Sequence, residues 1–152
     1  MKINFKKLFT IIILTILIGS IFSFFIGTDI YTKINRPFLS PPGIVFPIVW
    51  TVLYALMGIS LYMVLESSNI NKDSAFTIYI IQLIVNSSWT LIFFGLNNFL
   101  LGVFWIIFLI ILVITMIITF YRINKLSGLL QIPYLIWLCF ALYLNTMIYF
   151  LN

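Results

Sequence analysis

The chain has 152 residues, of which 64% are hydrophobic and 7% are charged, and its formal net charge is +5. Its mean hydropathy is +1.25, and soluble domains carry about a quarter charged residues, so the composition excludes a water-soluble globule and indicates an integral membrane protein. The basic excess is then expected to set membrane topology and to contact anionic headgroups, and nucleic acid is not expected as a partner.

Five apolar runs are long enough to cross about 30 Å of hydrocarbon, which takes roughly 20 helical residues. In chain order they cover Leu8–Ile26, Ile44–Leu65, Ala75–Leu96, Phe99–Tyr121 and Leu129–Leu151. The connectors leave no room for a second domain, and the alternating pattern of a membrane β-barrel is absent. The sequence therefore predicts an all-α membrane protein in which residues 1–152 form a single five-transmembrane-helix bundle.

The first apolar run has two interpretations. Three lysines among the first seven residues precede it and Gly19-Ser20 lies within it, a pattern also typical of a secretory signal peptide. The apolar character continues to Ile26, however, which is too long for the apolar region of such a peptide. The length favours a retained membrane helix.

The loop between the first two helices, residues 27–43, is the longest and the richest in proline. Pro37, Pro41 and Pro42 lack an amide donor and fix φ, so we do not expect this loop to be helical throughout. Because the prolines restrict the loop before folding, the loop loses less conformational entropy when it becomes ordered. These properties predict a stiff lid over the start of the second helix.

Aromatic and amide residues recur at helical spacing in three of the predicted helices. The stripes are Trp50, Tyr54, Met57 and Leu61 in the second; Gln82, Asn86, Trp89, Phe93 and Asn97 in the third; and Tyr134, Trp137, Ala141, Asn145 and Tyr149 in the fifth. Amides in lipid need partners, so we expect the stripes to point into the bundle. The alternative is simple helix packing or an interfacial aromatic belt, which we favour for Tyr149, Trp105 and Tyr121.

Basic residues in the loops predict the orientation. With five crossings, the side of the amino terminus holds six lysines and arginines, and the opposite side holds Lys33 and Arg36. The positive-inside rule then places the amino terminus in the cytoplasm and the carboxy terminus outside. The short loops and the absence of an import-type leader favour a bacterial plasma membrane.

Histidine is absent, cysteine occurs once, and the three acids, Asp29, Glu66 and Asp73, lie near predicted helix ends. Without histidine, the commonest zinc ligand and the usual proximal haem ligand are missing, so metal catalysis, covalent haem attachment and a Ser-His-Asp hydrolase are not expected. Ion pumps keep ionisable groups within the membrane, which disfavours that class. We expect no metal site, and we expect Cys139 to be a small core hydrophobe.

The second and fifth helices begin on the same side, so Trp50 and Trp137 lie at similar depth beneath the predicted lid. A lid over paired indoles with no charged group below it predicts a pocket for a flat, largely apolar ligand that stacks on aromatic faces.

Four stretches carry a resemblance to a known family. They are Pro37-x-x-x-Pro41-Pro42 with Phe46-x-x-x-Trp50-x-x-Leu53-Tyr54-x-x-x-Gly58; Asn86-x-x-Trp89 with Phe93-Phe94-Gly95; Pro133-Tyr134-Leu135-x-Trp137; and Phe140-Ala141-x-x-Leu144-Asn145 with Asn152. Together they resemble the signature of the TspO/MBR family, the tryptophan-rich sensory proteins and translocator proteins, also called peripheral benzodiazepine receptors. The match covers nearly the whole chain in the right order.

The resemblance implies a five-helix fold, often a homodimer, that binds protoporphyrin IX, and some bacterial members are described as degrading it in light and oxygen. Matched position by position, the candidate catalytic residues are Trp50 and Trp137. The candidate ligand-binding residues are Tyr31, Pro41, Pro42, Phe46, Tyr54, Asn86, Trp89, Ala141 and Asn145. The implied ligand or substrate is protoporphyrin IX, with no separate cofactor.

The chain departs from the family pattern at three positions. Leu39 and Val103 stand where the family usually has tryptophan, and Ile107 stands where an acid is common. The chain stops at Asn152, before the proposed sterol motif of animal members, so a physiological sterol role is not expected. Two functions are left open: a light-dependent porphyrin-degrading enzyme, and a non-enzymatic sensor or transporter of porphyrin or another small apolar ligand. A ligand-free scaffold is a third alternative.

Overall fold

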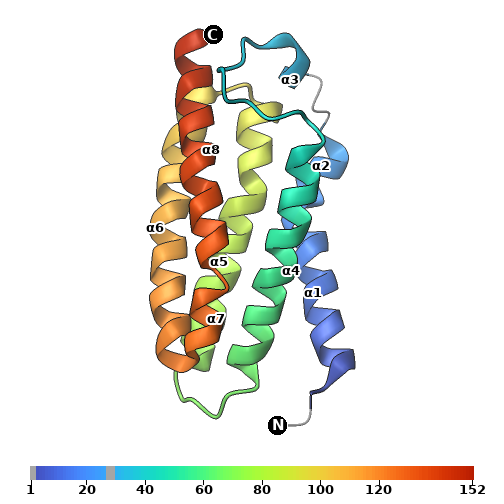
Figure 1. Ribbon diagram of the computed structural model, residues 1–152, viewed down its shortest axis with the longest axis vertical. Coiled ribbons are helices and arrows are strands. Elements are labelled where there is room, and N and C mark those ends of the chain that lie inside the picture. Colours follow the sequence, from blue (N-terminus) through green and yellow to red (C-terminus); the bar gives the residue numbers. More distant parts are fainter. Residues whose placement is uncertain (1–2, 27–29) are drawn as a thin grey trace.

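The computed structural model describes residues 3–26 and 30–152, without the side chains of residues 30 and 31, and it shows one elongated bundle (Figure 1). Its elements are α1 (Phe5–Gly19), α2 (Ile21–Phe25), α3 (Ile30–Lys33), α4 (Val45–Leu65), α5 (Lys72–Thr90), a π-helical turn η1 (Leu91–Gly95), α6 (Phe99–Ile123), α7 (Lys125–Leu129) and α8 (Ile132–Leu151). The long helices run side by side, so the bundle is all-helical over the described residues.

Four segments of the described chain are long and apolar enough to cross a membrane: Val45–Leu65, Lys72–Gly95, Phe99–Ile123 and Lys125–Leu151. They correspond to the last four predicted helices. The continuous first helix predicted over 8–26 is wrong, because the chain divides at Ser20 into α1, of 15 residues, and α2, of 5 residues. The Ser20 hydroxyl donates to the carbonyl of Ile16 at 2.5 Å, a back-bond of the kind that bends helices.

The ends of the helices follow local hydrogen-bonding chemistry. The turn after η1 passes through Asn97, which has φ of 52°, a left-handed conformation that Asn tolerates better than most residues. Asn98 then caps α6, its Oδ1 accepting from the amide of Leu101 at 3.0 Å, and Asn124 caps α7 in the same way by accepting from the amide of Leu126 at 3.0 Å. Both are preferred N-cap residues.

Three hydrogen bonds that involve buried hydroxyl groups join helices inside the bundle. The hydroxyls of Thr15 and Tyr79 lie 2.6 Å apart and join α1 to α5. The hydroxyl of Ser60 donates to the carbonyl of Ser127 at 2.6 Å and joins α4 to α7. The hydroxyl of Tyr134 donates to Oε1 of Gln82 at 3.1 Å and joins α8 to α5. Because lipid offers no replacement partners, these bonds specify how the helices pair.

Cys139 is exposed on the outer surface of α8, so the prediction that it lies in the core is wrong. Its neighbour Leu138 is buried at 1% exposure, and successive residues on a helix point about 100° apart. The inward face of α8 is formed by Tyr134, Leu138 and Asn145, and Cys139 falls off that face.

The two chain ends lie at opposite ends of the bundle (Figure 1). At the end of the amino terminus, Lys7 forms an ion pair with Glu66 at 2.5 Å, and the α4–α5 and α6–α7 connections lie there too. The opposite end carries α3, the proline-rich segment and the carboxy terminus. We call this second end the lid end. The described basic residues are therefore divided between the two ends as the sequence predicts.

Helix α1 comes close to α4 at Gly58. A Cβ at this position would lie 2.8 Å from Cα of Ile12, and a backbone atom cannot move away as a flexible side-chain tip can. Gly58 is fully inside α4 and buried. Only a glycine allows this approach of the two backbones.

We expect Gly58→Ala to destabilise the protein by about 1–3 kcal/mol, the usual cost of overpacking, although alanine by itself favours helix by about 1 kcal/mol. Unfolding in detergent by a chaotropic denaturant measures the difference. The matched control is Gly43→Ala, where no atom lies within 4 Å of an added Cβ. A Gly58→Ala protein as stable as the parent would contradict the close contact.

Candidate functional site

A cavity of about 610 Å³ lies within the lid-end half of the bundle. Its walls come from α1, α2, α4, α5, η1, α6 and α8. Eight of the predicted site residues line it: Phe46, Trp50, Tyr54, Asn86, Trp89, Trp137, Ala141 and Asn145. The structure therefore brings these residues, from three helices, around one space.

The wall on α4 is built from two rings one helical turn apart. Trp50 stacks on Tyr54 with ring centroids 5.4 Å apart and an interplanar angle of 29°, as side chains at i and i+4 can. The indole also meets the ring of Tyr134 edge-on at 6.1 Å. Trp50 and Tyr54 face the bundle interior, and the indole is held in a fixed orientation by rings on two sides.

Tyr54 joins three helices through its hydroxyl. The hydroxyl donates to the carbonyl of Gly19 at 2.8 Å and accepts from Nδ2 of Asn86 at 3.2 Å. Tyr54 is buried at 5% exposure. A Cβ on Gly19 would overlap the Tyr54 ring, so a glycine at the end of α1 is required for this hydrogen bond.

The wall opposite α1 is fixed by an indole–amide hydrogen bond. Nε1 of Trp89 donates to Oδ1 of Asn145 at 3.2 Å, and Nδ2 of Asn145 donates to the carbonyl of Ala141 at 2.9 Å. Trp89 also stacks on Phe93 at 4.9 Å. A Cβ on Gly102 would lie 3.3 Å from the Asn145 amide oxygen, so this glycine lets α6 approach the pair.

Trp137 lines the cavity from α8. Its ring meets Phe46 edge-on with centroids 5.9 Å apart. Its indole N–H is buried and has no hydrogen-bond partner within the part of the chain that the structure describes. Trp50 and Trp137 thus line the same cavity, from α4 and α8, as their positions near the starts of two helices at the same end predict.

The proline-rich segment crosses the lid end and is attached to the end of α8. The amide of Asn35 donates to Oδ1 of Asn152 at 2.9 Å, and Nδ2 of Asn152 donates to the carbonyl of Asn35 at 3.0 Å. Pro41 and Pro42 lie in this segment but outside the cavity lining, to which Thr32 and Gly43 contribute instead. The side chain of Tyr31, another predicted site residue, is outside what the structure describes.

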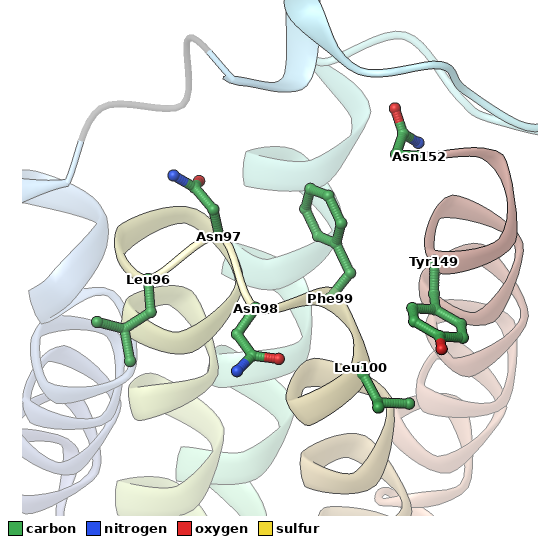
Figure 2. A pocket seen from close by; sticks show the side chains of 7 residues that line it. All are labelled: Leu96, Asn97, Asn98, Phe99, Leu100, Tyr149 and Asn152. Atoms are coloured by element: carbon green, nitrogen blue, oxygen red, sulfur yellow. The ribbon is translucent and has the colours of Figure 1, made fainter.

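A second, shallower cavity of about 330 Å³ opens at the lid end, between the α5–α6 turn and α8 (Figure 2). Its lining consists of Leu96, Asn97, Asn98, Phe99, Leu100, Tyr149 and Asn152. It contains none of the predicted site residues, and two of its three amides are already engaged in the cap of α6 and in the contact with Asn35. We therefore assign the site to the larger cavity.

The larger cavity offers aromatic faces and a few amides. None of its described lining residues carries a charge, and no group of three or more His, Cys, Asp or Glu that could hold a metal ion occurs among the described residues. Such a lining can stack and orient a flat ligand, and any difficult chemistry has to come from the ligand itself.

Several lining residues on the side of α2 were not predicted as site residues. Ser20, Ser23 and Phe24 line the cavity from this side, and Pro47 and Thr51 line it from α4. The break at Ser20 turns the first three toward the cavity, and a continuous helix over 8–26 gives no indication of that turn. Pro47 and Thr51 flank the Trp50–Tyr54 stripe and could have been found by widening it.

Comparisons with known proteins give one consistent result. The model of the TspO/MBR family matches residues 10–151. The chain is 40% identical over 152 residues to the tryptophan-rich protein TspO of Archaeoglobus fulgidus, covering 98% of this chain and 99% of the relative. It is 37% identical to the protein of the same name from Chlorobaculum tepidum, covering 80% and 78%. It is 31% identical to the human translocator protein, covering 84% and 78%.

We expect Tyr54→Phe to lower the free energy of unfolding by about 1–3 kcal/mol, because the carbonyl of Gly19 and the amide of Asn86 both lose their partner in a buried place. The ring and its stack on Trp50 stay. Denaturant unfolding in detergent measures the loss. Tyr143→Phe is the control, since Tyr143 lies at the outer surface at 36% exposure, and equal stability of the two variants would contradict the role of the Tyr54 hydroxyl.

Proposed function

The chain belongs to the TspO/MBR family of membrane proteins, and from this premise we propose that it binds protoporphyrin IX in the cavity between α4, α5 and α8 and degrades it photo-oxidatively. The observation that carries the proposal is the pair of indoles, Trp50 on α4 and Trp137 on α8, in the lining of one aromatic cavity. The porphyrin is ligand and substrate, and no separate cofactor is proposed.

Binding is supported by the size and chemistry of the cavity. Its volume of about 610 Å³ lies in the usual range of ligand pockets. Large flat aromatic surfaces stack on indole and phenol rings with a gain of about 0.5–1.5 kcal/mol per ring pair beyond area burial. The amides of Asn86 and Asn145 are held by Tyr54 and Trp89, so the ring faces are what this lining offers to a ligand.

The degradation step uses the chromophore. A porphyrin excited by light takes one electron from an electron-rich indole, which gives a porphyrin radical anion and an indole radical cation. Molecular oxygen adds to the porphyrin radical, the electron returns to the indole, and both oxygen atoms enter the product as a carbon–carbon bond of the macrocycle breaks, so that oxygen is the oxidant and the indole is restored. Trp50 or Trp137 is the donor in this proposal. Stacking on Tyr54 and edge contact with Phe46 hold the two indoles in place against the ligand.

The second candidate function is a non-enzymatic sensor or transporter of porphyrin or another small apolar ligand. It is favoured by the absence of any charged group among the described lining residues, because no acid or base is at hand to move protons during turnover. In this alternative the same cavity holds the ligand and releases it unchanged.

We further infer the arrangement in the membrane. Residues 1–152 form one domain in which α1 and α2 together make a fifth crossing beside the four long spans. The amino terminus is cytoplasmic and the carboxy terminus is outside, in a bacterial plasma membrane, which the basic residues near the amino-terminal end support. The resemblance to the family also supports a homodimer.

The test compares the double variant Trp50→Phe/Trp137→Phe with the parent protein. Because phenylalanine keeps a stacking face, binding of protoporphyrin IX should weaken by only about 1 kcal/mol, while light-dependent loss of its absorbance should stop. Absorbance and fluorescence of protoporphyrin IX with purified protein, in the dark and under illumination, measure both quantities.

The control is Trp105→Phe. This indole donates to the carbonyl of Val85 at 2.8 Å and lies outside the cavity lining, so its loss should leave photochemistry intact. Degradation by the double variant at the parental rate would contradict the electron-donor role. Saturable binding with bands that persist in the parent would identify a sensor or transporter, and no saturable binding would contradict both functions.

A further inference from the structure

We propose that the ligand enters the cavity sideways from the membrane, through a slot between α2 and α4. The proposal rests on the proposed function, because it concerns the access route to the same cavity. We call this opening the lateral slot and define it by Ser23 and Phe24 of α2 and Pro47 and Thr51 of α4.

The four residues of the lateral slot have two properties in common. Each lines the cavity, and each is also exposed on the outer surface of the protein. Phe24, for example, is 73% exposed. A side chain that both lines a cavity and meets the outside marks the place where that cavity opens. The slot continues toward the lid end as far as Thr32 and Gly43, which also line the cavity and are exposed.

The slot exists because the α1–α4 contact stops partway along α4. At Gly58 the two helices touch, with Cα of Ile12 2.8 Å from the position of an added Cβ. Thr51 and Pro47 lie seven and eleven residues before Gly58, which places them on the same face of α4, two and three turns further toward the lid end. Beyond the break at Ser20, α2 packs against α5, and among the described residues this face of α4 is exposed at Pro47 and Thr51.

Direct contacts between described residues bridge three other sides of the cavity. Between α4 and α8, the rings of Phe46 and Trp137 meet at 5.9 Å. Between α5 and α8, the Trp89 indole bonds to Asn145 at 3.2 Å. At the lid end, Asn35 and Asn152 exchange hydrogen bonds of 2.9 and 3.0 Å. A ligand arriving through the lid end has to break those bonds, and one arriving through the lateral slot does not.

The surroundings of the slot fit a ligand that comes from lipid. Pro47 and Thr51 lie within Val45–Leu65, a segment apolar and long enough to span the membrane. Phe24 and Phe25 on α2 are 73% and 82% exposed, and these adjacent apolar rings fit a hydrocarbon environment. The ligand class is therefore an amphipathic molecule that dissolves in the bilayer, as a porphyrin with a flat apolar ring system does.

The test links the two sides of the slot. In a Cys139→Ser background, Ser23→Cys and Thr51→Cys are joined by a short bis-maleimide, and the protein is placed in lipid nanodiscs. Protoporphyrin IX fluorescence gives the association and dissociation rates after mixing with porphyrin-loaded vesicles. Both rates should fall about tenfold or more, with little change in Kd, relative to the same protein carrying two monofunctional maleimides.

The matched control links the lid end instead, through Asn35→Cys and Asn152→Cys in the same background. Its association rate should stay within about twofold of its own unlinked form. Slow association in the lid-linked protein with normal association in the slot-linked protein would overturn the lateral route. A loss of affinity in the slot-linked protein at an unchanged association rate would also overturn it. Absence of saturable binding by the unlinked parent would instead overturn the proposed function.

Discussion

The structure depends on one constraint: inside a membrane, a buried polar group needs a partner within the protein. The Tyr54 hydroxyl on α4 pairs polar groups of three helices. It donates to the carbonyl of Gly19 at the end of α1 and accepts from Nδ2 of Asn86 on α5. This hydrogen-bonded joint lies at the floor of the cavity. It fixes where α1 ends, how deep α4 lies against α5, and the orientation of the ring on which Trp50 stacks.

The same constraint explains why the cavity is aromatic although its helices carry many amides. Asn86 and Asn145 are each bound to a neighbouring side chain, so they serve the packing of the bundle and leave ring faces toward the open space. Within each helical stripe, different residues therefore serve the stability of the bundle and the binding of a ligand. The amides of Asn86 and Asn145 hold the walls together, and Trp50 and Trp137 line the open space.

Access and closure are also consequences of how the helices end. The attachment of Asn35 to Asn152 holds the proline-rich segment over α8, while beyond the break at Ser20 α2 packs against α5. The cavity is thereby closed at the lid end and open along one side at membrane depth. For a ligand that partitions into lipid, this arrangement makes the bilayer itself the reservoir from which the site is filled.

The sequence by itself determined the class of protein, the four long spans and most of the inward stripes, because hydropathy and helical periodicity are local properties of the chain. The prediction that Asn97 points into the bundle is wrong, because the helix has ended and Asn97 lies exposed in the turn before α6. The sequence also predicted that Trp50 and Trp137 lie at the same end of the bundle, since residues near the starts of two helices that begin on the same side lie at similar depth. The tertiary structure decided what depends on contacts between distant residues. It divided the first helix at Ser20, where the Gly19 carbonyl meets Tyr54, and it turned Cys139 outward because the packing of α8 selects which face is buried. It also left Pro41 and Pro42 outside the cavity lining, since the reach of the lid is set by its bonds to Asn152.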